Sequence, residues 1–553
     1  MLKSTALALW SSLWRSHAQT KHHLRFYKLQ FSKSTIEHGK PGASSTSLSP
    51  TEKEKQPKPN YSKPQLIGLL LGPLLFVLTL LFFHPTDLSP EGRAVLASTL
   101  WIATWWVTEA IPIPATSLLP ILLLPLTGAM ESDAVFSSYG DDIIFLFLGG
   151  FFIATAMEKW DLHKRIALSI ISWIGTSTNR IIFGFMLATG FLSMWVSNTA
   201  ATMMMIPIGL AMVYQVSQTL KGEEHKTTLK KFEKAIIFGI GYSGTIGGLG
   251  TLIGTPPNII LAGTAQNLFD VEISFAGFMA FAAPLSIILI LFTWFFLTRI
   301  VYKVDLKQLP GGKEVITKEL SALGRVSFEE KIVLTVFCFA ATMWVTRTFL
   351  WESLIPGITD GMIAVTATIL LFLIPRREKS GEDDRILSWK DSKEIPWGIL
   401  LLFGGGLAIA AGFSESGLSD WLGNRLSVLD GMNIIIIIAA TTLLILFLTE
   451  ITSNTATATM IMPVVAALAL ALNIHPFALM VPGALAANCA FMLPVGTPPN
   501  AIIFGTGKIT IADMVKNGFW LNIIAAALII FAVTVLLPIM WGIDLNSVPE
   551  NFR

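Results

Sequence analysis

Charged residues are scarce in this chain of 553 residues. Aspartate, glutamate, lysine and arginine make up 14% of it, and hydrophobic residues make up 53%. A soluble domain is about a quarter charged, so this chain lacks the polar surface that a large soluble catalytic domain needs. The composition favours a polytopic membrane protein.

Cysteines and catalytic groupings are also few. Cys338 and Cys489 both lie in apolar stretches, so they predict neither a disulfide framework nor a metal–thiolate site, and we expect both to be small buried residues. The eight histidines are scattered, and no phosphate loop or Ser/His/Asp nucleophile arrangement stands out. We therefore predict a protein that is not an enzyme and has neither a cofactor nor a nucleic-acid partner.

Long apolar runs are what the chain has instead. One membrane-spanning helix needs about 20 apolar residues. Runs of that kind recur at 65–83, 278–301, 331–350, 431–449 and 517–541. With the interrupted runs between them, they predict roughly ten to twelve membrane elements, some of them half-length or broken.

Positive charge gathers at the N-terminus. Residues 1–64 carry eleven Lys and Arg against three acidic residues, whereas the tail after Met540 has one Arg. The positive-inside rule predicts a cytoplasmic N-terminus and a C-terminus on the far side, which requires an odd number of crossings. Residues 41–64 are rich in Ser, Pro and Lys and predict a disordered tether. The alternative is an organelle presequence over residues 1–36, where acidic residues are absent.

A three-residue motif occurs twice. Ser197-Asn198-Thr199, the first SNT motif, recurs 256 residues later as Ser453-Asn454-Thr455, the second SNT motif. Pro207 and Pro463 keep the same offset, as do LFLGGFFIATAM from Leu146 and LFGGGLAIAAGF from Leu402. This constant offset indicates an internal duplication. The predicted organisation is a basic arm (1–64), a first helix with the first repeat (65–320), a second repeat (321–545) and a short tail (546–553).

A second motif follows each SNT motif. Gly254-Thr255-Pro256-Pro257-Asn258 recurs 242 residues later as Gly496-Thr497-Pro498-Pro499-Asn500, so the second half is shorter by fourteen residues at the charged loop near 221–234. Tandem prolines cannot sustain helical hydrogen bonds, and glycine permits unusual dihedral angles. Each GTPPN motif is therefore expected to interrupt a helix.

Ser, Asn and Thr are costly in apolar surroundings unless they line a protected site. Exposed N–H groups at a helix end suit an anion, whereas carbonyls and hydroxyls suit Na⁺. Each helix end contributes only about 0.3–1 kcal/mol, so two of them cannot offset the dehydration of a dianion, and a cation beside it is favourable. The alternatives are hydrogen bonds between packed helices for the SNT motifs and mechanical kinks for the GTPPN motifs. The duplication favours a secondary transporter whose site lies between two repeats.

Two glutamates also lie in apolar surroundings. Glu109 and Glu450 invite a proton-relay interpretation, Glu450 in particular because the second SNT motif follows it closely. We prefer the interpretation that both are structural carboxylates at helix ends.

Together these motifs closely resemble the divalent anion:sodium symporter family, in particular its bacterial sodium-dependent dicarboxylate transporters. The resemblance covers residues 64–545. Besides the SNT and GTPPN pairs it rests on WWVTEAIPIPATSLLP (105–120), DIIFLFLGGFF (142–152) and LPVGTPPNAIIFGTGKIT (493–510).

This resemblance implies eleven transmembrane helices, two re-entrant hairpins with the SNT motifs at their tips, and two inverted repeats. It also implies a homodimer in the cell membrane, with a scaffold domain and a transport domain that moves like an elevator. The implied function is Na⁺-coupled symport of C4-dicarboxylates such as succinate, fumarate or malate into the cell. A Na⁺-independent dicarboxylate exchanger and a Na⁺-coupled citrate or sulfate transporter are alternatives with the same fold.

The resemblance also implies site residues. Those around the substrate carboxylates would be Ser197, Asn198, Thr199, Thr255, Ser453, Asn454, Thr455, Thr497 and Pro498. One Na⁺ site would use Ser193, Ser197, Asn198 and Gly254, and the other Thr449, Thr452, Asn454 and Gly496. Ser193 and Thr449 each lie four residues before their SNT motif, so the hydroxyls expected of a sodium-coupled member are present.

Overall fold

A computed structural model describes residues 61–175, 177–219, 223–303, 312–377, 384–426 and 431–552. Most of the predicted basic arm, up to residue 60, lies outside these ranges. The chain divides into two units, 1–61 and 62–553, and the second holds every element described below. Within the described ranges its elements are helices and include no strand. One isolated β-bridge pairs Pro375 with Arg385.

The predicted first helix is α2 (Lys63–Phe82). The helices in the remainder of the predicted first repeat are α3 (Pro90–Thr108), α4 (Ile113–Thr116), α5 (Leu119–Leu126), α6 (Ser132–Ser137), α7 (Asp142–Lys159), α8 (Leu162–Ile174), α9 (Thr178–Ser193), α10 (Asn198–Thr219), α11 (Glu223–Gly247), α12 (Pro256–Phe269) and α13 (Phe275–Phe295). Helix α14 (Gly312–Ala322) spans the predicted boundary at residue 320, and the predicted second repeat starts with α15 (Phe328–Thr346), α16 (Glu352–Leu354) and α17 (Asp360–Leu373).

The predicted second repeat continues with α18 (Trp397–Glu415), α19 (Leu418–Leu426), α20 (Ile434–Thr449), α21 (Asn454–Ala471), α22 (Phe477–Asn488), α23 (Pro498–Gly505), α24 (Ile511–Phe531) and α25 (Leu537–Trp541). Its helix bounds repeat those of the first half. Both ends of α20 lie 256 residues after the ends of α9, and α23 starts 242 residues after α12. The sequence duplication is therefore also a duplication of helices.

Local sequence signals account for many helix starts. The side chain of Asp141 caps α7, that of Asn433 caps α20, and Thr510 forms a capping box with Asp513 at α24. Such side chains accept hydrogen bonds from the first backbone N–H groups, which have no partner inside the helix. Helix starts are thus set by the sequence next to them.

The described residues include eight helical segments long and apolar enough to cross a membrane, together with shorter apolar helices. Helices cover the five predicted apolar runs except for residue 83 and residues 431–433 at the ends of two of them, and the prediction of an all-α polytopic membrane protein is confirmed. One detail was wrong: Cys489 is buried, but Cys338 is exposed on α15. A small apolar side chain suits hydrocarbon as well as a protein core, so an apolar stretch does not tell which of the two a residue faces.

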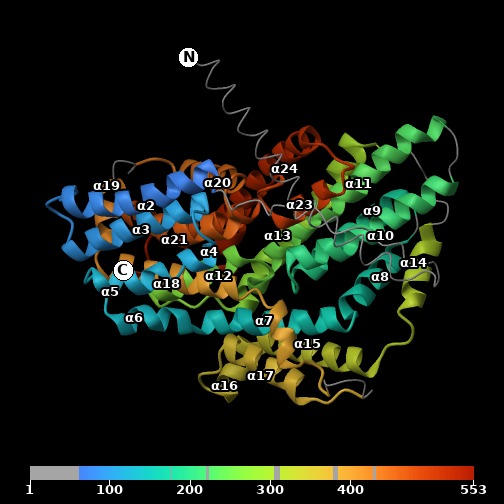
Figure 1. Ribbon diagram of the computed structural model, residues 1–553, viewed down its shortest axis with the longest axis horizontal. Coiled ribbons are helices and arrows are strands. Elements are labelled where there is room, and N and C mark those ends of the chain that lie inside the picture. The colour runs from blue at the N-terminus through green and yellow to red at the C-terminus, as the bar shows by residue number, and fades with distance from the viewer. Residues whose placement is uncertain are drawn as a thin grey trace, which may run out of the picture. The chain divides into compact units, whose positions relative to one another are not determined.

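The two repeats pack into each other (Figure 1). Helix α12 of the first repeat contacts α18, α21 and α22 of the second, and α23 of the second contacts α10 and α11 of the first. Since α12 and α23 each begin at a GTPPN motif, this exchange of partners brings both motifs to the interface between the repeats.

Candidate functional site

Each SNT motif lies at the tip of a helical hairpin. Helix α9 ends at Ser193 and α10 begins at Asn198, while α20 ends at Thr449 and α21 begins at Asn454. In the first hairpin the Ser197 hydroxyl accepts a hydrogen bond from the N–H of Ala200, at 3.1 Å, and so caps α10. The tips therefore present helix N-termini and side-chain oxygens together, as the sequence predicted.

Each GTPPN motif ends an interruption between two helices. Helix α11 stops at Gly247 and α12 starts at Pro256, and the corresponding gap lies between α22 and α23. Thr255 and Thr497 just before the prolines are extended, with φ,ψ of −153°, 145° and −139°, 148°. The prolines then occupy the first turn of the new helix, where a missing N–H costs nothing. The predicted helix interruptions are confirmed.

The first hairpin tip and the first interruption form a cluster of oxygens, which we call cluster one. The Ser193 hydroxyl lies 2.6 Å from Asn198 Oδ1 and also contacts the carbonyl of Gly244. A Cβ added to Gly248 would lie 2.6 Å from Asn198 Oδ1 and 3.0 Å from the Gly254 carbonyl oxygen. Only a glycine leaves this space open, and one hydroxyl hydrogen cannot satisfy so many acceptors. Such a set suits a hard cation.

The second hairpin tip forms a matching cluster two. The Thr449 hydroxyl lies 2.6 Å from Asn454 Oδ1 and 2.8 Å from the Ala487 carbonyl. The oxygen end of the Asn454 amide faces only acceptors: turned around, its nitrogen would lie 3.1 Å from the Gly496 carbonyl and 3.2 Å from that of Ala487. A surplus of acceptors is relieved either by a turned amide or by a cation.

Two residues of the predicted Na⁺ sites, Thr452 and Ser197, make hydrogen bonds outside the two clusters. The Thr452 hydroxyl donates back to its own turn, 2.8 Å from the Leu448 carbonyl, and lies 2.6 Å from the hydroxyl of Thr457 on α21. The Ser197 hydroxyl is exposed and caps α10. Neither side chain is drawn into the cluster by a hydrogen bond to its other members.

Seven of the nine predicted substrate residues are at least partly accessible. Asn198, Thr199, Ser453, Asn454 and Thr455 are half-buried, and Ser197 and Pro498 are exposed. Thr255 and Thr497 are buried, as are the cluster residues Ser193, Thr449, Gly254 and Gly496. A solute therefore reaches the amides and hydroxyls of the SNT motifs first.

The two motif threonines differ. The hydroxyl of Thr255 donates to Asn488 Oδ1 at 2.7 Å, so it offers a ligand only lone pairs. The hydroxyl of Thr497 accepts a long bond, 3.4 Å, from the N–H of Asn500, and among the described residues it donates to none. Thr497 is therefore the better donor for a carboxylate.

The last residue of each GTPPN motif has a role that the motif did not reveal. The amide nitrogen of Asn258 donates to the carbonyls of Gly248 (3.1 Å) and Thr251 (2.8 Å). That of Asn500 donates to Ala490 (2.9 Å) and Leu493 (3.0 Å), the residues 242 positions later. Each asparagine thus holds its own interruption closed. The repetition of Asn in both motifs was the available signal.

Glu450 is a structural carboxylate. It is 3% exposed and accepts hydrogen bonds of 2.7–3.1 Å from four donors. The donors are the backbone N–H groups of Phe491, Met492 and Leu493 and the amide of Asn522. Glu109 lies exposed at the end of α3 in the left-handed conformation. Both glutamates lie at helix ends, as predicted, and the four donors around Glu450 fit a structural role. The preference over a proton relay stays a prediction.

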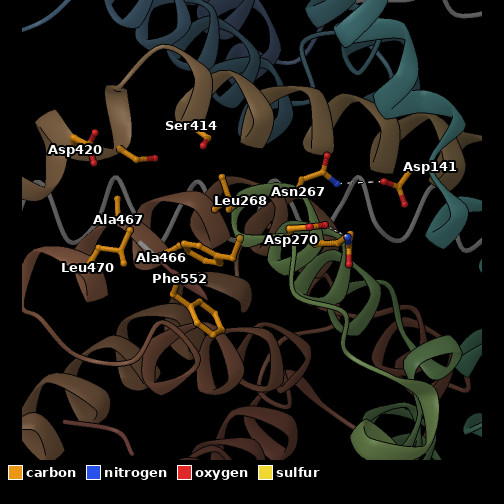
Figure 2. Close-up of a pocket in the computed structure, with 13 residues that line it drawn as sticks. Asp141, Asn267, Leu268, Asp270, Ser414, Asp420, Ala466, Ala467, Leu470 and Phe552 are labelled. Carbon is orange, nitrogen blue, oxygen red and sulfur yellow. Dashed lines mark hydrogen bonds between the residues drawn. The ribbon is translucent and has the colours of Figure 1, made fainter. Parts of the chain in front are cut away.

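The chain also has a large pocket away from the motifs. It measures about 680 Å³ and is lined by Asp141, Asp270 and Asp420, among others. Figure 2 shows the amide of Asn267 pointing to Asp141 at one end of it. The pocket lies at the C-terminal end of α12, whereas Thr255 precedes the N-terminal end, roughly 20 Å away at 1.5 Å per residue. Three carboxylates and this distance make it unsuited to a dianion.

Comparison with known proteins decides the family. The family model described as the transmembrane region of sodium:sulfate symporters matches residues 63–546. The chain belongs to this family of sodium symporters. The resemblance to divalent anion:sodium symporters is thereby confirmed, and with it the prediction of a transporter rather than an enzyme.

Its relatives include two named sodium-dependent dicarboxylate transporter SdcS. The one from Staphylococcus saprophyticus is 55% identical over 495 residues, which cover 89% of this chain and 95% of the relative. The one from Staphylococcus aureus strain USA300 is 56% identical over 498 residues, covering 90% and 95%. Among solved structures, the Neisseria gonorrhoeae efflux pump MtrF superposes with a TM-score of 0.51 at 14% identity, covering 85% of this chain and 95% of MtrF. That likeness concerns the fold alone.

Proposed function

We propose that this protein is a sodium-driven symporter that brings C4-dicarboxylates, such as succinate, fumarate or malate, into the cell. The observation that carries the proposal is the pair of oxygen clusters beneath the two SNT motifs. The relatives named as sodium-dependent dicarboxylate transporters support both the ion and the substrate class.

The clusters would hold Na⁺. Cluster one would use Ser193, Asn198 and Gly254, and cluster two Thr449, Asn454 and Gly496; Ser197 and Thr452 complete the proposed sets. All of them supply neutral oxygens, which hard cations prefer. A bound Na⁺ would hold the amide oxygens of Asn198 and Asn454 in the inward orientation that they have here and leave their nitrogens for the substrate.

The dicarboxylate would bind above the two cations. One carboxylate would bind at each SNT motif. The backbone N–H groups at the N-termini of α10 and α21 and the side-chain amides of the motifs would donate hydrogen bonds, and Thr497 would be a further donor. The other residues around the carboxylates would be Thr199, Thr455, Thr255 and Pro498. Two Na⁺ neutralise one dianion, so this stoichiometry is electroneutral. A third Na⁺ would add about 2.3 kcal/mol per 100 mV of membrane potential.

The movement would be that of an elevator. Both hairpins would be re-entrant and belong to a transport domain that slides against a scaffold, in a homodimer with eleven transmembrane helices and inverted repeats per chain. The basic N-terminal arm supports a cytoplasmic N-terminus in the cell membrane.

The test is uptake of radiolabelled succinate into proteoliposomes, with an inward Na⁺ gradient or equal K⁺, and with or without internal succinate. A symporter needs Na⁺ and no internal substrate. Uptake that ignores Na⁺ and needs internal dicarboxylate would contradict the proposal and indicate an exchanger. Competition by citrate or sulfate, stronger than by fumarate or malate, would contradict the substrate class.

A further inference from the structure

A single side chain joins the two repeats between the clusters. Asn488, the last residue of α22, is fully buried. Its amide oxygen accepts from the Thr255 hydroxyl at 2.7 Å, and its amide nitrogen donates to the Thr245 carbonyl at 3.0 Å. Both partners belong to the first repeat, on either side of its helix interruption. We call this set the Asn488 bridge.

The bridge ends next to both clusters. Thr255 directly follows Gly254, whose carbonyl belongs to cluster one. Asn488 directly follows Ala487, whose carbonyl accepts from Thr449 in cluster two. A shift of either carbonyl is therefore passed, through one peptide unit, to a hydrogen bond that crosses the repeat interface. No longer chain of contacts is required.

The bridge has no symmetrical counterpart. At the offset of 242 residues that relates the two GTPPN motifs, the position equivalent to Asn488 is Ile246, an apolar residue. Its side chain offers no hydrogen bond to the second repeat. Thr497, which corresponds to Thr255, is consequently left with its hydrogen for other partners. Among the described residues, this particular link is thus made from the second repeat to the first and is not repeated in the other direction.

We propose that Asn488 is a positioning residue that couples the two cation clusters, so that occupation of one favours occupation of the other. The inference rests on the proposed function, since it concerns the same two Na⁺ sites. A cation in cluster two fixes the end of α22, which fixes Asn488 and through it Thr255 and the Gly254 carbonyl. Positive cooperativity in Na⁺ follows from this order, because the second cation meets a site already arranged.

The test compares Asn488→Leu, which keeps the shape but loses both hydrogen bonds, with the wild type in Na⁺-dependent succinate uptake. The wild type should show a Hill coefficient for Na⁺ close to 2. The variant should show a coefficient close to 1 and a half-saturating Na⁺ concentration about tenfold higher, as expected for the loss of a buried hydrogen bond. Thr255→Val should reproduce both changes and Thr255→Ser should restore cooperativity.

Three outcomes separate coupling from damage. If Asn488→Leu and Thr255→Val break the same link, the double variant should be no worse than the worse single variant. Ile246→Val, at the equivalent position of the other repeat, should keep the wild-type coefficient. A wild-type coefficient in purified Asn488→Leu, or additive effects in the double variant, would overturn the inference while the symporter remains. Wild-type uptake without any response to Na⁺ would overturn both.

Discussion

The partners of Glu450 make a quantitative prediction for Glu450→Gln. Four donors converge on this buried carboxylate. The new amide nitrogen would face the N–H of Leu493, which loses its acceptor and is left buried and unsatisfied at a cost of about 3 kcal/mol. A hydrogen bond to a charged acceptor is worth about 1 kcal/mol more than one to a neutral acceptor, so weakening the other three bonds costs about 3 kcal/mol more.

One gain opposes these losses. A neutral amide no longer has to be desolvated as an ion, which returns about 3 kcal/mol. The free energy that keeps segment 489–497 closed therefore falls by about 3 kcal/mol. The population of the open segment rises by a factor on the order of a hundred. The Gly496 carbonyl lies in that segment, so the half-saturating Na⁺ concentration should rise as well.

Hydrogen exchange read by mass spectrometry measures this directly. Amides of Phe491, Met492 and Leu493 should exchange on the order of a hundred times faster in Glu450→Gln. Glu109→Gln, at an exposed helix end, is the matched control and should change neither exchange nor uptake. Unchanged exchange at 491–493 would refute the reasoning. If uptake nevertheless lost a pH dependence, Glu450 would be a proton carrier and not a clamp.

Three further predictions concern other parts of the chain. Gly248→Ala puts a methyl group 2.6 Å from Asn198 Oδ1, so the half-saturating Na⁺ concentration should rise at least about tenfold, whereas Gly140→Ala, which meets nothing within 4 Å, should leave it unchanged. Burial in the loop between α21 and α22 lowers the pKa of His475 to about 4 from its ordinary 6.5. The neutral ring is favoured in the folded state, so its contribution to the stability is complete above pH 6.5 and falls between pH 6.5 and 4. Thermal unfolding at both ends of this range should show a smaller loss of stability on acidification in His475→Asn than in the wild type. An equal loss would show that His475 does not cause the acid sensitivity. Phe552 lines the acidic pocket, so that pocket opens on the side of the C-terminus. In a Cys338→Ser background, Ser419→Cys in this pocket should react with an impermeant maleimide added outside intact cells. Protection of Ser419→Cys from the reagent would contradict a cytoplasmic N-terminus.

The helices of this fold were predictable because the sequence signals of membrane helices are local. A run such as 517–541 is helical wherever it packs, and tandem prolines at Pro256 and Pro498 interrupt a helix in any context. The hairpin tips were predictable for a related reason, since the duplication showed that polar residues in two apolar segments share one purpose. Local composition and repetition were sufficient for both.

The connections within the site were not predictable in this way. Asn488 belongs to no motif, and its partners lie more than 230 residues away. Gly248 matters through the space beside it, which depends on where Asn198 comes to lie. The sequence also gave no sign that Thr452 bonds within its own turn or that Cys338 faces outward. These features depend on tertiary packing, which a periodic pattern does not encode.

The self-contained closure of each helix interruption has an evolutionary consequence. Asn258 and the carbonyls that it holds lie within eleven consecutive residues, and so do Asn500 and its partners. A gene segment that encodes one half therefore carries its complete binding loop, and its duplication produces two working loops at once. Later change at a single position, such as Asn488 or Ile246, can then make the halves unlike without opening either loop. Diversification of such transporters should accumulate at the seam between the ancestral copies sooner than inside them.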